Sequence, residues 1–269
     1  PSAEEKGTAF KMANEIIAIL EDIMEEYPDK FTLVKSPDEI SNEKGVLQVV
    51  YGMENGAPIE SNLSNIKLFS DLGINYITLA HSKSNHISDS SYDENKNWGG
   101  LSPFGREVVA EMNKQGVMID ISHVSDAAFY EVLKLSKTPV IASHSSLRHF
   151  VPGFERNVSD DMLKELAKNG GVIQICFGSE FIGEKRKYPE LVITVKDVAD
   201  HIDRVKELVG IDHVGIGSDY DGWRNFPVGL EDTSTYPNLI EELLKRNYSK
   251  EEIRKVFGEN LLRVWRDVK

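Results

Sequence analysis

Two histidines stand at corresponding places in neighbouring segments of the sequence. His123 ends the apolar run in VMIDISHVS (residues 117–125), and His144 ends the run in PVIASHSS (residues 139–146). Each run is rich in β-branched residues and precedes a segment with helical spacing, so each histidine is predicted where a strand leads into a helix. The carboxyl ends of parallel strands lie side by side, and in a (β/α) barrel they form the rim that carries active sites. Two imidazoles there, near carboxylates from other strand ends, predict a metal site.

Polar side chains also follow other predicted strands. Glu54 comes just after the strand 46–53, His81 ends the strand 76–80, and Asp219 stands at the exit of the strand in 213–222. Each has a structural alternative: a histidine can be a hydrogen-bonded core residue, Glu54 beside Gly56 can be a turn residue, and Asp221 competes with Asp219. Because polar side chains recur at the ends of most predicted strands, we favour one site that these ends share.

Strands and helices alternate along the whole sequence. The predicted strands are 46–53, 76–80, 117–121, 139–143, 172–177 and one within 213–222, a stretch that also contains the strand exit. The predicted helices are 3–26, 61–71, 102–115, 125–135, 159–169, 194–209, 237–246, 250–257 and 259–268. Alternation predicts an α/β fold with a parallel sheet and right-handed crossovers. A GxGxxG turn typical of dinucleotide-binding sheets is absent, and polar residues on distant strands can cooperate only if the sheet closes. The prediction is therefore a (β/α)8 TIM-barrel type fold in a single domain, 1–269.

The alternation supplies about six of the eight strands that such a barrel needs. The sequence opens on a helix with no strand before it, which predicts an N-terminally incomplete barrel that lacks two strands. A shortened or open barrel is the alternative. The polar loop 82–100 is long enough to be functional or mobile, and His86 and Asp89 within it are candidates for shaping a cleft.

Composition excludes several function classes. The 269 residues carry 44 acidic and 31 basic side chains, a net charge of −13, so nucleic acid is an unfavourable partner. The single cysteine, Cys176, excludes an intrachain disulfide and lies in an apolar run that predicts burial. No apolar run reaches the roughly 18 residues that a membrane span needs. No signal peptide opens the sequence, which does not decide between a cytoplasmic and an exported protein.

Eight short motifs resemble, in the same order, those of the membrane (renal) dipeptidase family of metallopeptidases and its bacterial homologues. They are GMENG, TLAHSKSNHISDS, GLSPFGREVV, IDISHVS, PVIASHSS, ERNVSDD, GIGSDYDG and the closing NLLRVW, from about residue 46 to the C-terminus. The resemblance implies a (β/α)8 barrel that binds two zinc ions, forms a homodimer and cleaves dipeptides through a metal-bridged hydroxide. Dipeptides with a D- or dehydro-residue at the C-terminal side are among the implied substrates. The single cysteine and the lack of a hydrophobic C-terminal tail look more like the soluble bacterial members.

The same resemblance implies roles for individual residues. Glu54 matches the carboxylate that bridges the two metals, and His123 and His144 match the histidines of the second metal. His81 matches the histidine that orients the substrate and polarises the scissile carbonyl. Arg156, otherwise readable as a surface ion-pair partner, matches the residue that binds the terminal carboxylate of the substrate, and Asp219 matches the acid/base. Asp120 is expected to orient a ligand histidine.

One part of the family pattern has no counterpart in this sequence. The His-x-Asp pair that holds the first metal in the family is absent from every predicted strand end, so the first site is incomplete. The pair His201 and Asp203 has the spacing but lies inside a predicted helix, where both are expected on the surface. Glu54, His123 and His144 would still form a three-ligand zinc site with an open position. The remaining alternatives are a hydrolase for another amide or a lactone, and an inactive metal-binding fragment.

Overall fold

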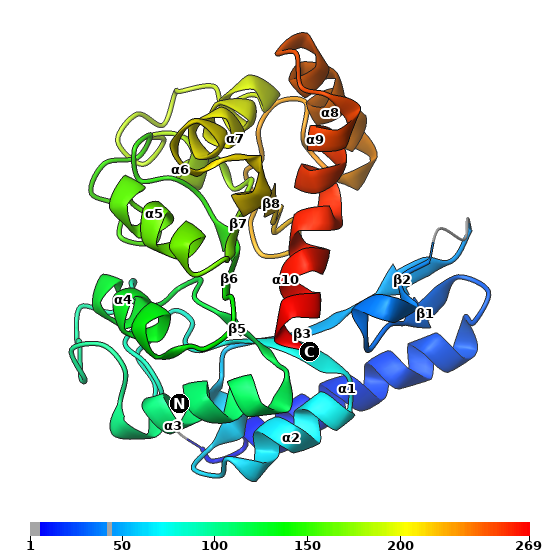
Figure 1. Ribbon diagram of the computed structural model, residues 1–269, viewed down its shortest axis with the longest axis vertical. Helices are drawn as coiled ribbons and strands as arrows, with labels where there is room; N and C mark the ends of the chain where they lie inside the picture. The colour runs from blue at the N-terminus through cyan, green and yellow to red at the C-terminus, as the bar shows by residue number, and fades with distance from the viewer. Residues whose placement is uncertain (1–5, 42–44) are drawn as a thin grey trace. The chain divides into compact units, whose positions relative to one another are not determined.

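The computed structural model describes residues 6–41 and 45–269. The chain divides into two compact units, and Figure 1 labels their helices and strands. Unit 1 comprises Pro1–Thr138 with Trp265–Lys269, and unit 2 comprises Pro139–Val264. In each unit, parallel strands alternate with helices, as the sequence predicts.

Unit 1 contains a parallel sheet in the order β3-β4-β5 and a separate parallel pair, β1 and β2. Its elements are α1 (Ala9–Glu26), β1 (Phe31–Leu33), β2 (Leu47–Val49), β3 (Tyr51–Glu54), α2 (Ser64–Asp71), β4 (Ile74–Thr78), α3 (Pro103–Gln115), β5 (Met118–Asp120) and α4 (Asp126–Leu135), with short 3-10 turns at Pro37–Glu39 and Ala57–Ile59. Every residue of β5 is buried. Burial on both faces is what a parallel strand covered by helices requires.

Unit 2 contains parallel strands in the order β6-β7-β8. Its elements are β6 (Ile141–Ser145), α5 (Asp160–Lys168), β7 (Val172–Ile175), α6 (Ser179–Ile182), α7 (Val195–Val209), β8 (Val214–Ile216), α8 (Tyr236–Lys245), α9 (Lys250–Arg254) and α10 (Asn260–Val268), with short turns at Ile211–His213, Thr233–Thr235 and Lys255–Glu259. The end of α10, from Trp265 on, belongs to unit 1. All four residues of β7 are buried, and so is Cys176 just after it, as predicted; burial raises the pKa of its thiol to about 12.

The local signals in the sequence placed most helix ends correctly. Ser102 caps α3 by accepting a hydrogen bond from the Gly105 N–H at 2.8 Å, and Pro103 takes the first helical position. Gly116 ends the helix with φ 65°, a left-handed conformation that suits glycine. The prediction of one strand over 46–53 is wrong, because the structure has two strands there, β2 and β3, separated at Val50. The three-residue β1, which was not predicted, pairs with β2.

The prediction that His201 lies on the surface is wrong. His201 is on α7 and is completely buried. It shares the inner face of this helix with Val198, Ile202 and Val205, at the three- and four-residue spacing that places side chains on one face. Burial lowers the pKa of the imidazole to about 4. Asp203 points to other partners: it accepts hydrogen bonds from Arg246 at 2.6 Å and from the Tyr248 hydroxyl at 2.7 Å.

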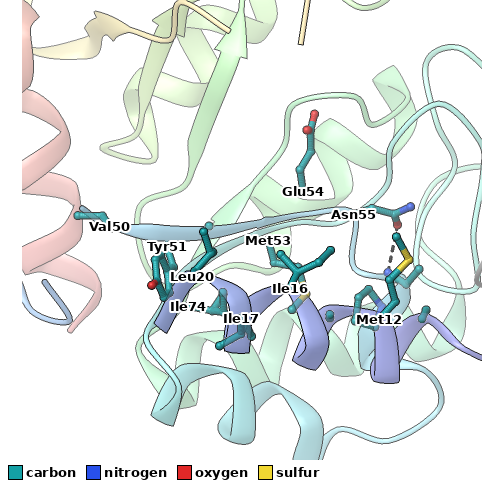
Figure 2. Close-up of a pocket in the computed structure, with 15 residues that line it drawn as sticks. Met12, Ile16, Ile17, Leu20, Val50, Tyr51, Met53, Glu54, Asn55 and Ile74 are labelled. Carbon is teal, nitrogen blue, oxygen red and sulfur yellow. Dashed lines mark hydrogen bonds between the residues drawn. The ribbon is translucent and has the colours of Figure 1, made fainter. Parts of the chain in front are cut away.

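An apolar groove of about 580 Å³ lies between α1 and β3 (Figure 2). Met12 and Ile16 of α1 line it and are 51% and 47% exposed, whereas the neighbouring Ile17 is 5% exposed. Tyr51 of β3 also lines it, and its buried hydroxyl has no hydrogen-bond partner among the residues the structure describes. β3 stands first in the strand order, so its outer edge faces no other described strand of this sheet. The groove is therefore an open apolar surface beside an unpaired strand edge.

Two adjacent substitutions test whether the groove is open. We expect Ile16→Asn to change the free energy of unfolding by no more than about 0.5 kcal/mol, because the side chain is largely in water already. Ile17→Asn, the matched control, should cost more than about 2 kcal/mol, because it places an amide in the core. Urea denaturation followed by circular dichroism measures both. Equal destabilisation by the two variants would show that the groove is covered in solution.

Candidate metal and substrate site

Three of the predicted site residues converge in unit 1. Glu54 is the last residue of β3, and its side chain extends away from α1 (Figure 2). Its Oε1 atom lies 3.0 Å from Nε2 of His123 and 3.4 Å from Nε2 of His81. The two imidazole rings are 4.4 Å apart between centroids. One carboxylate oxygen thus faces two imidazole nitrogens, and a carboxylate with an imidazole, here Glu54 with His123, is a donor pair typical of transition-metal sites.

The long loop 82–100 holds the backbone of both histidines. The Ser90 hydroxyl donates to the carbonyl of His81. The backbone N–H and the hydroxyl of Ser91 donate to the carbonyl of His123, at 2.7 and 2.9 Å. These bonds place the two histidines, which come from different strand exits, against one loop. The loop therefore has a positioning role.

The two candidates within this loop have different surroundings. The buried Asp89 carboxylate accepts hydrogen bonds from the backbone N–H groups of Trp98 at 3.1 Å and Gly100 at 3.0 Å. Asp89 therefore folds the loop back on itself. The ring of His86 stacks on Phe104, with 5.5 Å between centroids. Asp120, at the end of β5, accepts from the Thr78 hydroxyl and from the Ser122 N–H, which shapes the turn that leads to His123.

In unit 2, His144 and Arg156 lie close together. His144 is in β6, and the Ser143 hydroxyl lies 2.7 Å from its Nδ1. Arg156 is 3% exposed; its Nη1 donates to the Ser145 hydroxyl and its Nη2 to the carbonyl of His144, both at 2.7 Å. Its guanidinium carbon lies 5.3 Å from the centre of the Phe181 ring. Ser145 and Phe181 were not predicted from sequence; Ser145 lies within the PVIASHSS motif, which could have pointed to it.

Within residues 6–41 and 45–269, Arg156 forms no ion pair with a carboxylate, and its buried Nε has no hydrogen-bond acceptor. A buried cation without a counter-ion is costly, and it is normally retained where an anion binds. The prediction that Arg156 is more than a surface ion-pair residue is consistent with this burial.

Asp219 stands three residues beyond β8. The Cys176 thiol lies 3.8 Å from its Oδ2, and its own carbonyl accepts from the Gly222 N–H at 3.1 Å. A Cβ added to Gly222 would lie 2.1 Å from Oδ1 of Asp219, so a glycine is needed there. Asp221, the alternative acid/base candidate, is exposed. The DYDG motif could have indicated Asp219 rather than Asp221, because a glycine three residues later lets the backbone come close to the Asp219 carboxylate.

Two of these strand exits have backbone strain. His123 has φ 68° and Asp219 has φ 63°, both in the left-handed region. That conformation costs roughly 1–2 kcal/mol for a non-glycine residue. Residues kept in it cluster at functional sites, where the position of the side chain outweighs the cost. The observation supports functional roles for both residues.

Carboxylate and imidazole groups at the ends of parallel strands, with a guanidinium in the segment after β6, are the arrangement expected of a metal-binding protein of the (β/α) barrel class. The chain belongs to the membrane dipeptidase family (Peptidase family M19), because the model of that family matches residues 1–269. This match confirms the resemblance read from the sequence, and the solved structures described below confirm the α/β fold class with a parallel sheet.

Individual relatives agree with this assignment. Dipeptidase tcpJ of Claviceps purpurea (strain 20.1) is 40% identical over 254 residues, 94% of this chain and 59% of the relative. Dipeptidase 3 of Homo sapiens is 39% identical over 265 residues, 97% of this chain and 53% of the relative. The chain thus spans about half the length of these curated relatives.

Solved structures match the fold closely. An amidohydrolase from Pseudomonas aeruginosa superposes with a TM-score of 0.87 at 31% identity, covering 96% of this chain and 85% of that one. A metallo peptidase from Rhodobacter sphaeroides, liganded with a phosphinate mimic of the dipeptide L-Ala-D-Ala, gives 0.86 at 25% identity, covering 94% and 73%. In the described part of the chain, no helix combines the length and the apolar character needed to cross a bilayer.

The strain at Asp219 predicts a gain in stability when it is relieved. We expect Asp219→Gly to raise the free energy of unfolding by about 0.5–1 kcal/mol, since glycine adopts positive φ without a steric penalty. Asp221→Gly, two residues on and without positive φ, should lower it by roughly 0.5 kcal/mol. Urea titrations compare the two variants. A loss of stability in Asp219→Gly as large as that in the control would mean that position 219 is not strained.

Proposed function

We propose that this chain carries the active-site residues of a zinc-dependent dipeptidase, which hydrolyses the peptide bond of dipeptides. The observation that carries the proposal is the convergence of Glu54 with His81 and His123 in unit 1. The dipeptidase names of the relatives support the reaction class. The phosphinate dipeptide mimic bound to one structural neighbour supports substrates with a D-residue at the C-terminal side.

The donor set of the site fits a zinc ion. Glu54, His123 and His144 offer one carboxylate and two imidazoles, a common ligand set for catalytic zinc. Zinc bound to such ligands lowers the pKa of a coordinated water from 15.7 to about 7 and polarises carbonyl oxygens. The family resemblance implies two zinc ions, and no His-x-Asp pair stands at the end of a described strand to complete the first site. The proposal for these 269 residues is therefore one zinc site from Glu54, His123 and His144.

The remaining residues would bind the substrate and move its proton. Arg156 would pair with the terminal carboxylate, because its two Nη atoms are already fixed by Ser145 and His144 and its charge lacks a counter-ion within the described residues. His81 would donate a hydrogen bond to the scissile carbonyl and stabilise the developing negative charge. Asp219 would accept the proton of the attacking water and return it to the leaving amine. A site for a terminal carboxylate limits substrates to short peptides.

We also propose that residues 1–269 belong to one (β/α) barrel domain, and that the protein is a homodimer as expected for its family. The open groove beside β3 supports the first point, because further strands of the same barrel would cover Met12 and Ile16 and pair with the edge of β3. The curated relatives are long enough to supply such strands.

Metal content and peptide hydrolysis on one sample test the proposed function. Purified protein should contain zinc and cleave a dipeptide, and removal of zinc by a chelator should abolish cleavage. Glu54→Gln should weaken zinc binding at least 10- to 100-fold, because a neutral amide replaces a charged ligand. The matched control, Asp221→Asn, removes one exposed carboxylate outside the ligand set and should bind zinc normally. Zinc binding that is unchanged in Glu54→Gln would contradict the assigned ligand set.

The role of Arg156 makes a separate prediction. We expect Arg156→Gln to raise KM for a dipeptide roughly 10- to 100-fold, since a charge-assisted hydrogen bond contributes about 1.5–3 kcal/mol. Hydrolysis of the same dipeptide with an amidated C-terminus should be nearly unaffected. Steady-state kinetics measures KM for the dipeptide and for its amide in the wild-type and variant proteins. Equal losses on both would favour the alternative function, hydrolysis of another amide or of a lactone.

A further inference from the structure

A buried histidine that the proposed chemistry does not use connects two segments around Arg156. Both ring nitrogens of His201 are hydrogen-bonded: Nδ1 accepts from the Leu147 N–H at 3.0 Å, and Nε2 lies 3.0 Å from the carbonyl of Ile182. Since a backbone N–H must donate and a carbonyl must accept, the proton is on Nε2 and the ring is neutral. The ring of Phe150 packs against it at 4.4 Å between centroids.

The first of these bonds fixes the segment that carries Arg156. Leu147 pairs with Val158 in an isolated parallel bridge. Around it, the Val158 N–H donates to the Ser146 carbonyl at 2.9 Å, and the Arg148 N–H donates to the Val158 carbonyl at 2.8 Å. The segment 146–158 is therefore closed at its base, and Arg156 lies within it. His201 holds that base through the backbone of Leu147.

The second bond fixes the segment that carries Phe181. Ile182 follows Phe181, whose ring lies 5.3 Å from the guanidinium carbon of Arg156. The Asn157 side chain donates to the Phe181 carbonyl at 2.7 Å. Phe181 is therefore held from two sides, by Asn157 through its own carbonyl and by His201 through the next one. These contacts set the distance between the aromatic ring and the guanidinium.

We propose that His201 is a positioning residue that holds the Arg156 guanidinium in the geometry needed to bind a substrate carboxylate. The proposal rests on the proposed function of Arg156. A cation that is oriented before the substrate arrives loses little freedom on binding, so preorganisation improves affinity for the carboxylate. An imidazole suits the task because its small rigid ring presents an acceptor on one side and a donor on the other. Asparagine can reproduce the acceptor near Leu147, and glutamine can reproduce the donor near Ile182.

The test compares two substrates across four variants. The substrates are L-Ala-D-Ala and its C-terminal amide, which lacks the carboxylate. His201→Phe removes both bonds, whereas His201→Asn and His201→Gln each keep one. His213→Phe is the matched control, since the Nδ1 of His213 lies 2.8 Å from the Gly171 carbonyl, outside the Arg156 segment.

We expect His201→Phe to lower the ratio of kcat/KM for the dipeptide over the amide by roughly 10- to 100-fold, mainly through KM, as for a misplaced binding group. The asparagine and glutamine variants should each recover part of this ratio, and His213→Phe should leave it unchanged. If His201 had only a structural role, His201→Phe would lower kcat/KM equally for the dipeptide and for its amide. That result, or an unchanged ratio in a folded His201→Phe protein, overturns the proposal.

A readout without catalysis separates this proposal from the proposed function. If the wild-type protein cleaves neither substrate, the proposed function fails, and the positioning role is decided by hydrogen exchange of the Arg156 guanidinium protons in NMR spectra. Faster exchange in the His201 variants than in His213→Phe supports the positioning role. Equal exchange overturns it. If His201→Phe does not fold by circular dichroism, the asparagine and glutamine variants give the same comparison.

Discussion

The burial of parallel strands on both faces is the constraint on which the rest of the structure depends. β5 and β7 are buried at every position, so their side chains are committed to the core and their backbone groups to the sheet. Only the residues at or beyond the strand ends can offer charged or imidazole groups to a ligand. Glu54 at the end of β3 and Asp219 beyond β8 show the result.

Strand exits alone would leave these side chains loosely placed, and hydrogen bonds with neighbouring hydroxyl and carbonyl groups hold them in position. Ser90 and Ser91 hold the carbonyls of His81 and His123, while Ser145 and the His144 carbonyl hold Arg156. Ser90 and Ser91 belong to a loop and leave both imidazoles unused, whereas Ser145 and His144 belong to β6 and accept hydrogen bonds directly from the Nη atoms of Arg156. The positive φ of His123 and Asp219 shows that part of the stability is given up for the same purpose.

The groove beside β3 shows what happens where a parallel sheet has an edge. The unpaired edge and the exposed side chains of α1 form an apolar surface that a soluble protein usually covers. The curated relatives that this chain resembles are about twice as long. Both observations bear on the proposed barrel, because a further strand paired with the edge of β3 would cover this groove.

The sequence by itself determined the alternation of strands and helices, the parallel fold class and the positions of the candidate ligands. Periodicity, caps such as Ser102 and glycine stops such as Gly116 act over a few residues, so they can be read directly. The motif order also identified the family. Short elements gave weak signals: the three-residue β1 and the break at Val50 depend on pairing between distant segments.

Only the tertiary structure decided which residues meet. His201 looked like a surface residue because helical spacing does not show which face of a helix is covered; the structure buries it between Leu147 and Ile182, segments 54 and 19 residues away. The same holds for Ser145 and Phe181 around Arg156, and for the approach of Glu54 to two histidines. Contacts between residues far apart in the chain come from packing of the whole domain, and that information is not local to any stretch of the sequence.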